Sequence, residues 1–305
     1  MHTPTVSDLV SACDALWPPE YAESWDTVGL AVGDPDATVR KVLFALDPTD
    51  AVVEKAVSGG YDLLLTHHPL MLRGVTSVSA ATLKGGAVHR LIRAGVAQFN
   101  AHTNADSALG GVTDVLADLI DLRDRQPLAP TAGAPEGVGI GRVGSLSEPR
   151  TVAEVARTLA AAVPATVTGV RIAGAPEAPV TRVAVLGGAG DSMFEAVRAH
   201  DVDLYITSDL RHHPATEARD TAHRTDDRPH LVDVVHWAAE SPWCEVAADQ
   251  LSVELDRRGF AVDIDVDHTV TDPWTLRIDQ GTHAVPADGA GASAAGDETN
   301  GNGDL

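Results

Sequence analysis

The stretch "DLLLTHHPL", residues 62–70, decides how the fold of this chain is interpreted. A short apolar run has the composition of a buried strand, and Thr66, His67 and His68 follow it directly. Adjacent side chains of a regular strand point to opposite faces of the sheet, so two neighbouring histidines serve one site only where the strand stops. Pro69 enforces that stop. The stretch therefore predicts a buried strand that ends on two imidazoles.

Apolar runs and helical patterns alternate on both sides of this stretch. "KVLFALD" (41–47) predicts a strand, and the helical pattern after it begins at Thr49, a good N-cap residue. In the second half, "RVAVLGG" (182–188) predicts a strand, "DSMFEAVRAHD" a helix, and "DLYITSDLRHHP" (203–214) a strand with its loop. Such alternation is typical of an α/β protein with largely parallel strands and right-handed crossovers.

A weak internal repeat supports two related lobes. Residues 41–69 and 182–214 share the order strand, Gly- or Asp-containing turn, helix, and a strand that begins with Asp-Leu. Both segments then reach a Thr and a His-His-Pro sequence. We therefore expect two related α/β lobes with largely parallel sheets.

Loose, polar segments divide the chain. "RQPLAPTAGAPEGVG" (125–139) is rich in Pro and Gly and predicts a linker between lobes, and residues 218–230 predict a polar surface connection. The C-terminal tail is Gly, Ala and Asp without periodicity, which predicts disorder. The expected parts are a discontinuous metal-binding lobe (1–124 plus 228–278), a second α/β lobe (125–227) and a disordered acidic tail (279–305).

Composition excludes several classes of protein. The 305 residues carry a net charge of -22, which repels phosphate backbones and anionic membranes, so nucleic acid is not an expected partner. The two cysteines, Cys13 and Cys244, are too few for a disulfide framework and fit a reducing cytoplasm. The N-terminus lacks the pattern of a secretory signal, and no run of 18 apolar residues occurs. We expect a soluble, cytoplasmic protein.

Donor residues for metal ions follow three expected strand ends. They are His67 with His68, then His102 with Asp106, then His236 with Glu240. Ligands of parallel α/β sheets gather at the carboxyl ends of strands, so these donors can converge. Two histidines at one corner reach two neighbouring metal positions more easily than they reach the same position. This geometry suits a pair of ions.

Each donor group also has a plain structural interpretation. A His-His pair is often a surface feature, Asp106 has the position of a helix N-cap, and His102 can cap a turn. His236 and Glu240 share a helix face by their spacing, or lie in a loop before a helix that starts at Ser241-Pro242.

Two further clusters have an open role. Asp209, His212 and His213 are expected to make polar loop contacts or to line the cleft, with ligation as the alternative. "LGGAGDS" (186–192) is the nearest approach to a phosphate-binding loop and is interpreted as a tight strand-to-helix turn.

Seven ordered motifs carry a resemblance to a known family. They are "ESWDTVGLAVGD", "ALDPT", "DLLLTHHPL", "AHTNADSALGGVTDVLA", "GIGRVGSL", "RVAVLGGAGDSMFEAVRAHDVDLYITSD" and "DVVHWAAE". Together they resemble the NIF-three-like (Ngg-interacting-factor-three-like) dinuclear metal centre family, whose members are often called GTP cyclohydrolase 1 type 2 homologues. The resemblance covers residues 1–278.

The resemblance implies a toroidal homohexamer of two-lobed subunits that each hold two divalent metal ions. The family's ligands fall on the residues that the strand ends selected, with Glu240 as the bridge: His67, His68, Asp106, His236 and Glu240. This chain departs from the family pattern at Thr27, Ser208 and Val235, where Asn, Gly and Gly are usual, and it lacks an inserted domain that some members carry. No departure removes a ligand, but the shape of the cleft, and therefore the substrate, stays open.

Two functions are compatible with such a site. The first is a metal-dependent hydrolase of cyclohydrolase, phosphoester or amide type acting on a small molecule, in which His102 orients a water or transfers a proton. The second is a metal-binding scaffold or metal-trafficking protein without turnover. Mixed imidazole and carboxylate donors accept Zn, Fe, Mn or Ni, so the sequence does not name the ion.

Overall fold

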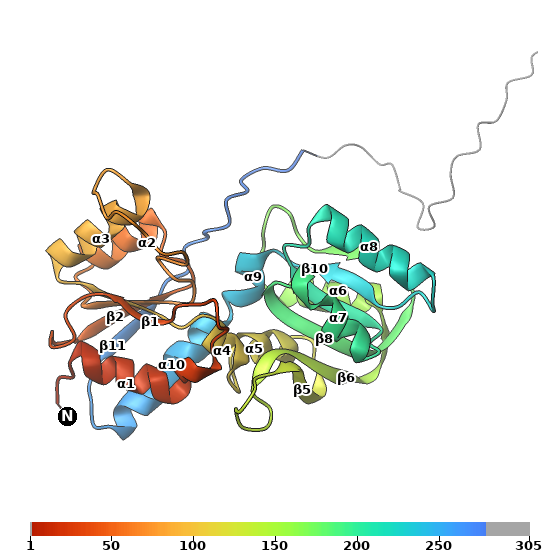
Figure 1. Cartoon of the computed structure of the whole chain (residues 1–305), viewed down its shortest axis with the longest axis horizontal. Helices are drawn as coiled ribbons and strands as arrows, with labels where there is room; N and C mark the ends of the chain where they lie inside the picture. The colour runs from red at the N-terminus through yellow and green to blue at the C-terminus, as the bar shows by residue number, and fades with distance from the viewer. Residues whose placement is uncertain (1, 279–305) are drawn as a thin grey trace, which may run out of the picture.

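The chain folds into two sheets, each covered by helices (Figure 1). The structure, a computed structural model, describes residues 2–278. We call the five-stranded sheet with its helices the first lobe and the six-stranded sheet with its helices the second lobe. The tail of residues 279–305, for which we expected disorder, lies outside the described residues.

The first lobe has the strand order β1-β4-β3-β2-β11. Its strands are β1 (Gly29–Val32), β2 (Lys41–Ala45), β3 (Leu63–Thr66), β4 (Ala97–Asn100) and β11 (Asp263–Val266). Its helices are α1 (Val6–Leu16), α2 (Asp50–Ser58), α3 (Leu83–Ala94) and α10 (Trp243–Arg257), with a 3-10 turn η1 (Pro19–Tyr21). The strands β4, β3, β2 and β11 are parallel neighbours, and β1 is antiparallel at one edge, so the expected largely parallel sheet is confirmed here.

Alternation along the strands buries both faces of this sheet. Leu43 and Leu64 pack with apolar residues of α2 and α3, whereas Phe44 and Leu65 pack with apolar residues of α1 and α10 on the other face. The predicted cap of α2 is confirmed, because the Thr49 hydroxyl accepts a hydrogen bond from the Val52 amide at 3.4 Å. A sheet buried on both faces leaves its strand ends as the place for polar side chains.

The second lobe has the strand order β5-β6-β8-β9-β10-β7. Its strands are β5 (Arg123–Pro130), β6 (Gly139–Thr151), β7 (Arg171–Ala173), β8 (Pro179–Ala189), β9 (Leu204–Ser208) and β10 (His230–Asp233). Its helices are α6 (Val152–Ala162), α7 (Phe194–Ala199) and α8 (His212–His223), with a 3-10 turn η2 (Asp191–Met193). The sheet is mixed: β8, β9 and β10 are parallel, while β5–β6, β6–β8 and β10–β7 pair antiparallel. The α/β class is confirmed, and the expectation of largely parallel strands holds only for the centre of this sheet.

Three sequence-based boundaries differ from the structure. The segment 125–139 is not a linker, because it contains most of β5 and the hairpin loop to β6. The segment 218–230 is not wholly a surface connection, because α8 continues to His223 and β10 begins at His230. Residues 228–278 do not all belong to the first lobe, because β10 pairs with β9 in the second sheet.

Three short helices connect the lobes and carry site residues: α4 (Thr103–Ser107), α5 (Val112–Asp118) and α9 (His236–Glu240). Figure 1 shows all three between the two sheets. Asp106 lies inside α4, and α5 begins only after Gly110 and Gly111, so the N-cap interpretation of Asp106 is wrong. Within residues 2–278, no helix is both long and apolar enough to cross a membrane.

Candidate metal centre

The corner after β3 places two imidazoles side by side. The backbone amides of His67 and His68 still bond to β2, through Ala45 O at 3.2 Å and Leu46 O at 2.9 Å. The two rings are 4.9 Å apart, centroid to centroid. His67 is fully buried and His68 is partly exposed, so the two rings occupy an inner and an outer position.

A one-turn helix brings the third strand end to this corner. The Ala239 amide bonds to Val235 O at 2.9 Å, which closes α9 directly after β10. Within α9, His236 and Glu240 are four residues apart and share one face. The helical alternative for this pair is therefore the one that the structure adopts, and Glu240 is 2% exposed.

Glu240 lies at the centre of the donor cluster. Its Oε2 atom is 3.0 Å from His68 Nε2, 3.0 Å from His236 Nε2 and 3.8 Å from His67 Nε2. His67 Nε2 is also 3.7 Å from Asp106 Oδ1. The two donor triplets that share Glu240, each with its ligand atoms within 4.8 Å of one another, are His67–Asp106–Glu240 and His68–His236–Glu240.

Three buried polar atoms of the cluster make no hydrogen bond: His67 Nε2, Asp106 Oδ1 and Glu240 Oε2. The 3.0 Å contacts of Glu240 with His68 and His236 are ion-pair contacts. A buried polar atom without a partner costs about 1–3 kcal/mol, and native proteins rarely leave one unexplained. These three atoms are the donor atoms of one triplet and point at one another. The donor set thus fits a divalent cation, which would satisfy all three.

The Nδ1 atom of each imidazole is held by an oxygen outside the cluster. This arrangement fixes the ring orientation and turns Nε2 inward, as in carboxylate–histidine–metal triads. The four pairs are His67 with Ala101 O at 2.8 Å, His68 with Asp47 at 2.6 Å, His102 with Asp26 at 2.9 Å, and His236 with Asp209 at 2.7 Å.

The buried carboxylates of Asp106 and Glu240 and the neighbouring imidazoles shift one another's pKa values. Burial, and then the negative charge of Glu240, raise the pKa of Asp106 to about 7. Burial would also raise the pKa of Glu240, but His236, His68 and His67 hold it well below its ordinary value. Burial opposes protonation of His68 and His236, yet the charge of Glu240 and the hydrogen bonds to Asp47 and Asp209 raise their pKa values to about 9 and about 11. The negative charge of the two buried carboxylates must therefore be neutralised, either by protons or by metal ions.

The structure brings all five sequence-predicted ligands together. His102 joins them, because a ring nitrogen of His102 lies within 4.8 Å of ring nitrogens of His67 and His68. His212 and His213 do not: they begin α8 and are exposed. Of that fourth cluster, Asp209 alone contacts the site, as the hydrogen-bond partner of His236.

Sequence reasoning missed four residues that shape the site. Asp26 and Asp47 hold His102 and His68, although no spacing marked them. Gly188 lies near the end of β8 and has a φ of +79°, and the strand-to-helix turn predicted for this segment follows at Gly190, between β8 and η2. A Cβ atom there would lie 2.7 Å from Glu240 Oε1, and one at Gly187 would lie 3.0 Å from Val112. The Gly-Gly pair of "LGGAGDS" therefore lets β8 approach the cluster.

Replacing Asp209 with Asn tests the role of this outer carboxylate. We expect metal affinity at the His68–His236–Glu240 position to fall about 10- to 100-fold, because the imidazole of His236 loses its charged partner. Metal titration of the apoprotein measures the effect. Asp220→Asn, on the exposed side of α8, is the matched control and should bind metal as the wild type does. Equal affinities for the two variants would contradict the assignment.

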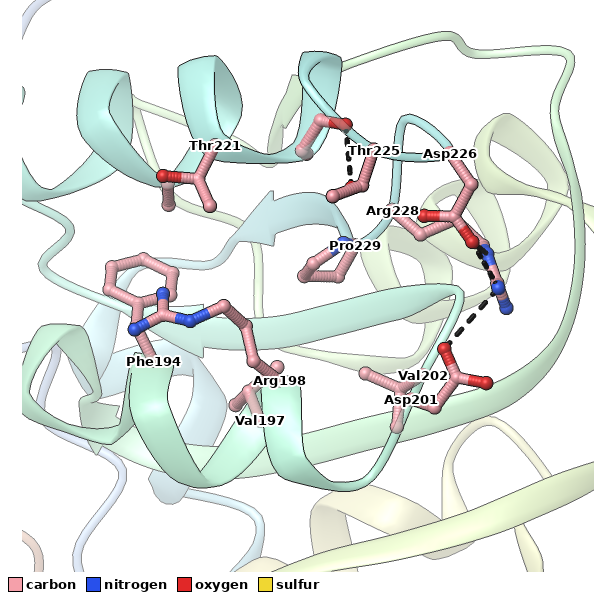
Figure 2. Close-up of a pocket in the computed structure, with 12 residues that line it drawn as sticks. Phe194, Val197, Arg198, Asp201, Val202, Thr221, Thr225, Asp226, Arg228 and Pro229 are labelled. Carbon is pink, nitrogen blue, oxygen red and sulfur yellow. Dashed lines mark hydrogen bonds and ion pairs between the residues drawn. The ribbon is translucent and has the colours of Figure 1, made fainter.

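Two of the cavities in the described residues are candidate places for a ligand. The first, of about 380 Å³, lies in the second lobe between α7 and α8, as Figure 2 shows. It has an apolar floor that includes Phe194, and Arg228 on its rim is paired with Asp203 and Asp226. It lies at the amino ends of β9 and β10 and contains no residue of the donor cluster. The second cavity, of about 360 Å³, is lined by His68 and His236.

Fold and cluster together define a two-lobed α/β protein with a candidate metal centre between its lobes. The model of the Duf34/NIF3 (NGG1p interacting factor 3) family matches residues 4–273. This chain belongs to that family.

Known relatives agree with this assignment over nearly the full length. A Streptomyces coelicolor protein named GTP cyclohydrolase 1 type 2 homolog is 52% identical over 276 residues, which cover 90% of this chain and 95% of the relative. A Mycobacterium tuberculosis protein with the same name is 35% identical and covers 90% of this chain and 98% of the relative. Among solved structures, a Bacillus cereus protein related to NIF3 has a TM-score of 0.82 at 22% identity, with coverage of 91% and 100%. A hypothetical protein of Staphylococcus aureus has a TM-score of 0.81 at 26% identity, with coverage of 90% and 100%.

Proposed function

We propose that this protein is a metal-dependent hydrolase that holds two divalent ions on Glu240. The observation that carries the proposal is the asymmetry of the two triplets. His67, Asp106 and Glu240 are all buried, whereas His68 and His236 are partly exposed and line the 360 Å³ cavity. A closed position suits a structural ion, and a position that opens on a cavity suits a substrate.

The residues of this chain divide the work. His67 and Asp106 would hold the inner ion, His68 and His236 the outer ion, and Glu240 both. A bound pair of divalent ions supplies Lewis acidity, which polarises a substrate oxygen and lowers the pKa of water.

His102 has the position of a proton carrier. Its ring is 5.2 Å from that of His67 and 5.6 Å from that of His68, and Asp26 holds its Nδ1. The Asp26 side chain is fully buried, which keeps the ring oriented. In this position His102 accepts or donates a proton through Nε2.

The name that the relatives share suggests which type of hydrolysis to test first. The relatives are called GTP cyclohydrolase 1 type 2 homolog. Hydrolytic opening of a heterocyclic ring fits a paired-ion site, and we keep phosphoester and amide hydrolysis beside it.

The proposal is tested by removing one ligand of each triplet. Asp106→Asn should lose the inner ion and His236→Ala the outer ion, so each variant should keep about half of the wild type's metal. Elemental analysis of purified protein measures this. Turnover by wild type loaded with Zn, Fe, Mn or Ni should be lost in both variants, and in His102→Ala without loss of metal. The substrates are nucleotides, phosphodiesters and amides.

The second candidate function is a metal carrier without turnover. It is favoured by the partial exposure of His68 and His236, through which an ion can leave. Fast exchange of the outer ion, together with no hydrolysis under any metal, would favour the carrier over the enzyme.

We also propose a cytoplasmic homohexamer for this chain. The proposal rests on its family membership and on the resemblance described above. Light scattering of the purified protein tests it, and a monomer would contradict it.

A further inference from the structure

The cavity beside His68 and His236 has walls from both lobes. Asp47 and His68 come from strand ends of the first lobe, whereas Arg171, Asp209 and Asp233 come from the second lobe. The carboxyl ends of β2, β3, β9 and β10 thus meet at one crevice, which is where α/β folds bind ligands. A volume of about 360 Å³ accommodates a molecule of one or two fused rings.

The remaining wall is the extended segment that follows β11, residues 267–274, which we call the arm. Two contacts anchor the arm to the first lobe. Asp267 pairs with Lys55 at 2.6 Å, and its amide bonds to Phe44 O at 2.7 Å. Farther along, the Thr271 hydroxyl donates to Asp47, the residue that holds His68. The arm therefore has a defined course past the metal centre, and Figure 1 shows its route between the lobes.

Charge in this cavity is negative on the side away from the metal ligands. Arg171 is neutralised by Asp233 at 2.9 Å. Asp272 lies on the arm, is half-buried and lines the cavity. Burial raises the pKa of Asp272, a hydrogen bond from the backbone of Trp274 opposes that rise, and the neighbouring charge of Asp209 adds to it. The carboxylates on this side would attract a group with N–H donors or positive charge.

Two indole side chains complete the cavity. Trp274 lines it from the arm and is 66% exposed. Trp237 lines it from α9 and is 9% exposed. A large exposed indole beside a polar cavity is a surface on which a planar ring stacks.

We propose that this cavity binds a planar heteroaromatic ring that carries an amidine- or guanidine-type pair of N–H donors. Trp274 packs against the ring, and Asp272 with Asp209 accepts the N–H bonds. The ring then lies beside His68 and His236, so the inference rests on the proposed function and specifies its substrate class.

Two probes of nearly equal shape test the inference by calorimetry on the metal-loaded chain. 2-Aminobenzimidazole carries the N–H pair, and benzimidazole lacks it. We expect 2-aminobenzimidazole to bind about tenfold or more tightly than benzimidazole. Asp272→Asn should abolish the preference for the amino compound. Trp274→Ala should weaken the binding of 2-aminobenzimidazole and of benzimidazole about fivefold or more each.

Matched variants control for effects of the arm and of surface charge. Asp263→Asn removes an exposed carboxylate of β11, and Leu276→Ala removes a side chain that is 74% exposed just beyond the arm. Both should bind the probes as the wild type does. Equal binding of the two probes, no binding of either, or an unchanged preference in Asp272→Asn overturns the inference.

The outcome is separable from that of the proposed function. Selective binding without hydrolysis of any substrate would keep the cavity assignment and reject the enzyme. Hydrolysis without selective binding would keep the enzyme and reject the assignment.

Discussion

Replacing Glu240 with Ala is expected to remove both metal ions. The carboxylate belongs to both donor triplets, and its Oε2 atom lies 3.0 Å from Nε2 of His68 and of His236. Loss of an outer hydrogen-bond partner of a metal ligand costs about 10- to 100-fold in affinity, so loss of a shared ligand should cost more than about 100-fold at each position. Metal content of the purified protein, measured beside its melting temperature, gives the result.

The matched control is Glu245→Ala. Glu245 lies on α10, has a side chain that is 57% exposed, and pairs only with His268 at 3.2 Å among the contacts of residues 2–278. This variant should keep the full metal content. A Glu240→Ala protein that is folded and still holds two ions per chain would show that Glu240 is not the shared ligand.

The position of the site could be predicted because its signals are local. An apolar run stopped by Pro69 placed His67 and His68 at a strand end, and the spacing of His236 and Glu240 placed both on one face. The internal repeat also has a structural counterpart, since β2–α2–β3 and β8–α7–β9 both join parallel neighbouring strands. Short-range patterns of this kind depend on backbone periodicity, which the sequence states directly.

The residues that orient the imidazoles could not be predicted in the same way. Asp26, Asp47 and Asp209 lie 76, 21 and 27 residues from the histidines they hold. The chain has 44 acidic residues, and nothing in the spacing separates Asp26 and Asp47 from the rest. Asp209 is predicted to line the cleft, which it does, but its pairing with His236 could not be predicted. Such contacts are set by tertiary packing, which only coordinates show.

The second sheet was mispredicted because composition masked its strands. Pro127 and Pro130 make β5 look like a linker, but β5 is an edge strand, where a residue without an N–H is tolerated. Glycines interrupt the strand pattern at the start of β6. Gly139 and Gly141 have positive φ angles there. Edge position and glycine geometry are tertiary facts, so the antiparallel half of the sheet was not recognised.

Replacing Arg142 with Met is expected to give the largest loss of stability. Arg142, in β6, is 1% exposed and makes a two-pronged contact with Asp114 of α5, at 2.8 Å for each prong. It also donates to Ala108 O, at the end of α4, at 2.9 Å. Removing one partner of a buried ion pair costs about 3–5 kcal/mol, which lowers the Tm of a chain of this length by roughly 5–9 °C. Thermal unfolding of the metal-free chain measures the change.

The hydrogen bond from Arg142 to Ala108 O joins the second sheet to α4, the helix that carries Asp106. Losing this bond should therefore also weaken metal binding. We expect Arg142→Met to weaken the inner ion more than the outer ion, because α4 supplies a ligand only to the inner triplet. Arg123→Ala, whose side chain is 64% exposed in its pair with Asp121, should change the free energy of unfolding by less than about 0.5 kcal/mol. The double variant Arg142→Met, Asp114→Leu should recover part of the stability, since no charge is then left buried alone. A double variant as unstable as Arg142→Met would mean that the carbonyl contacts of Arg142, and not its ion pair, join the two lobes.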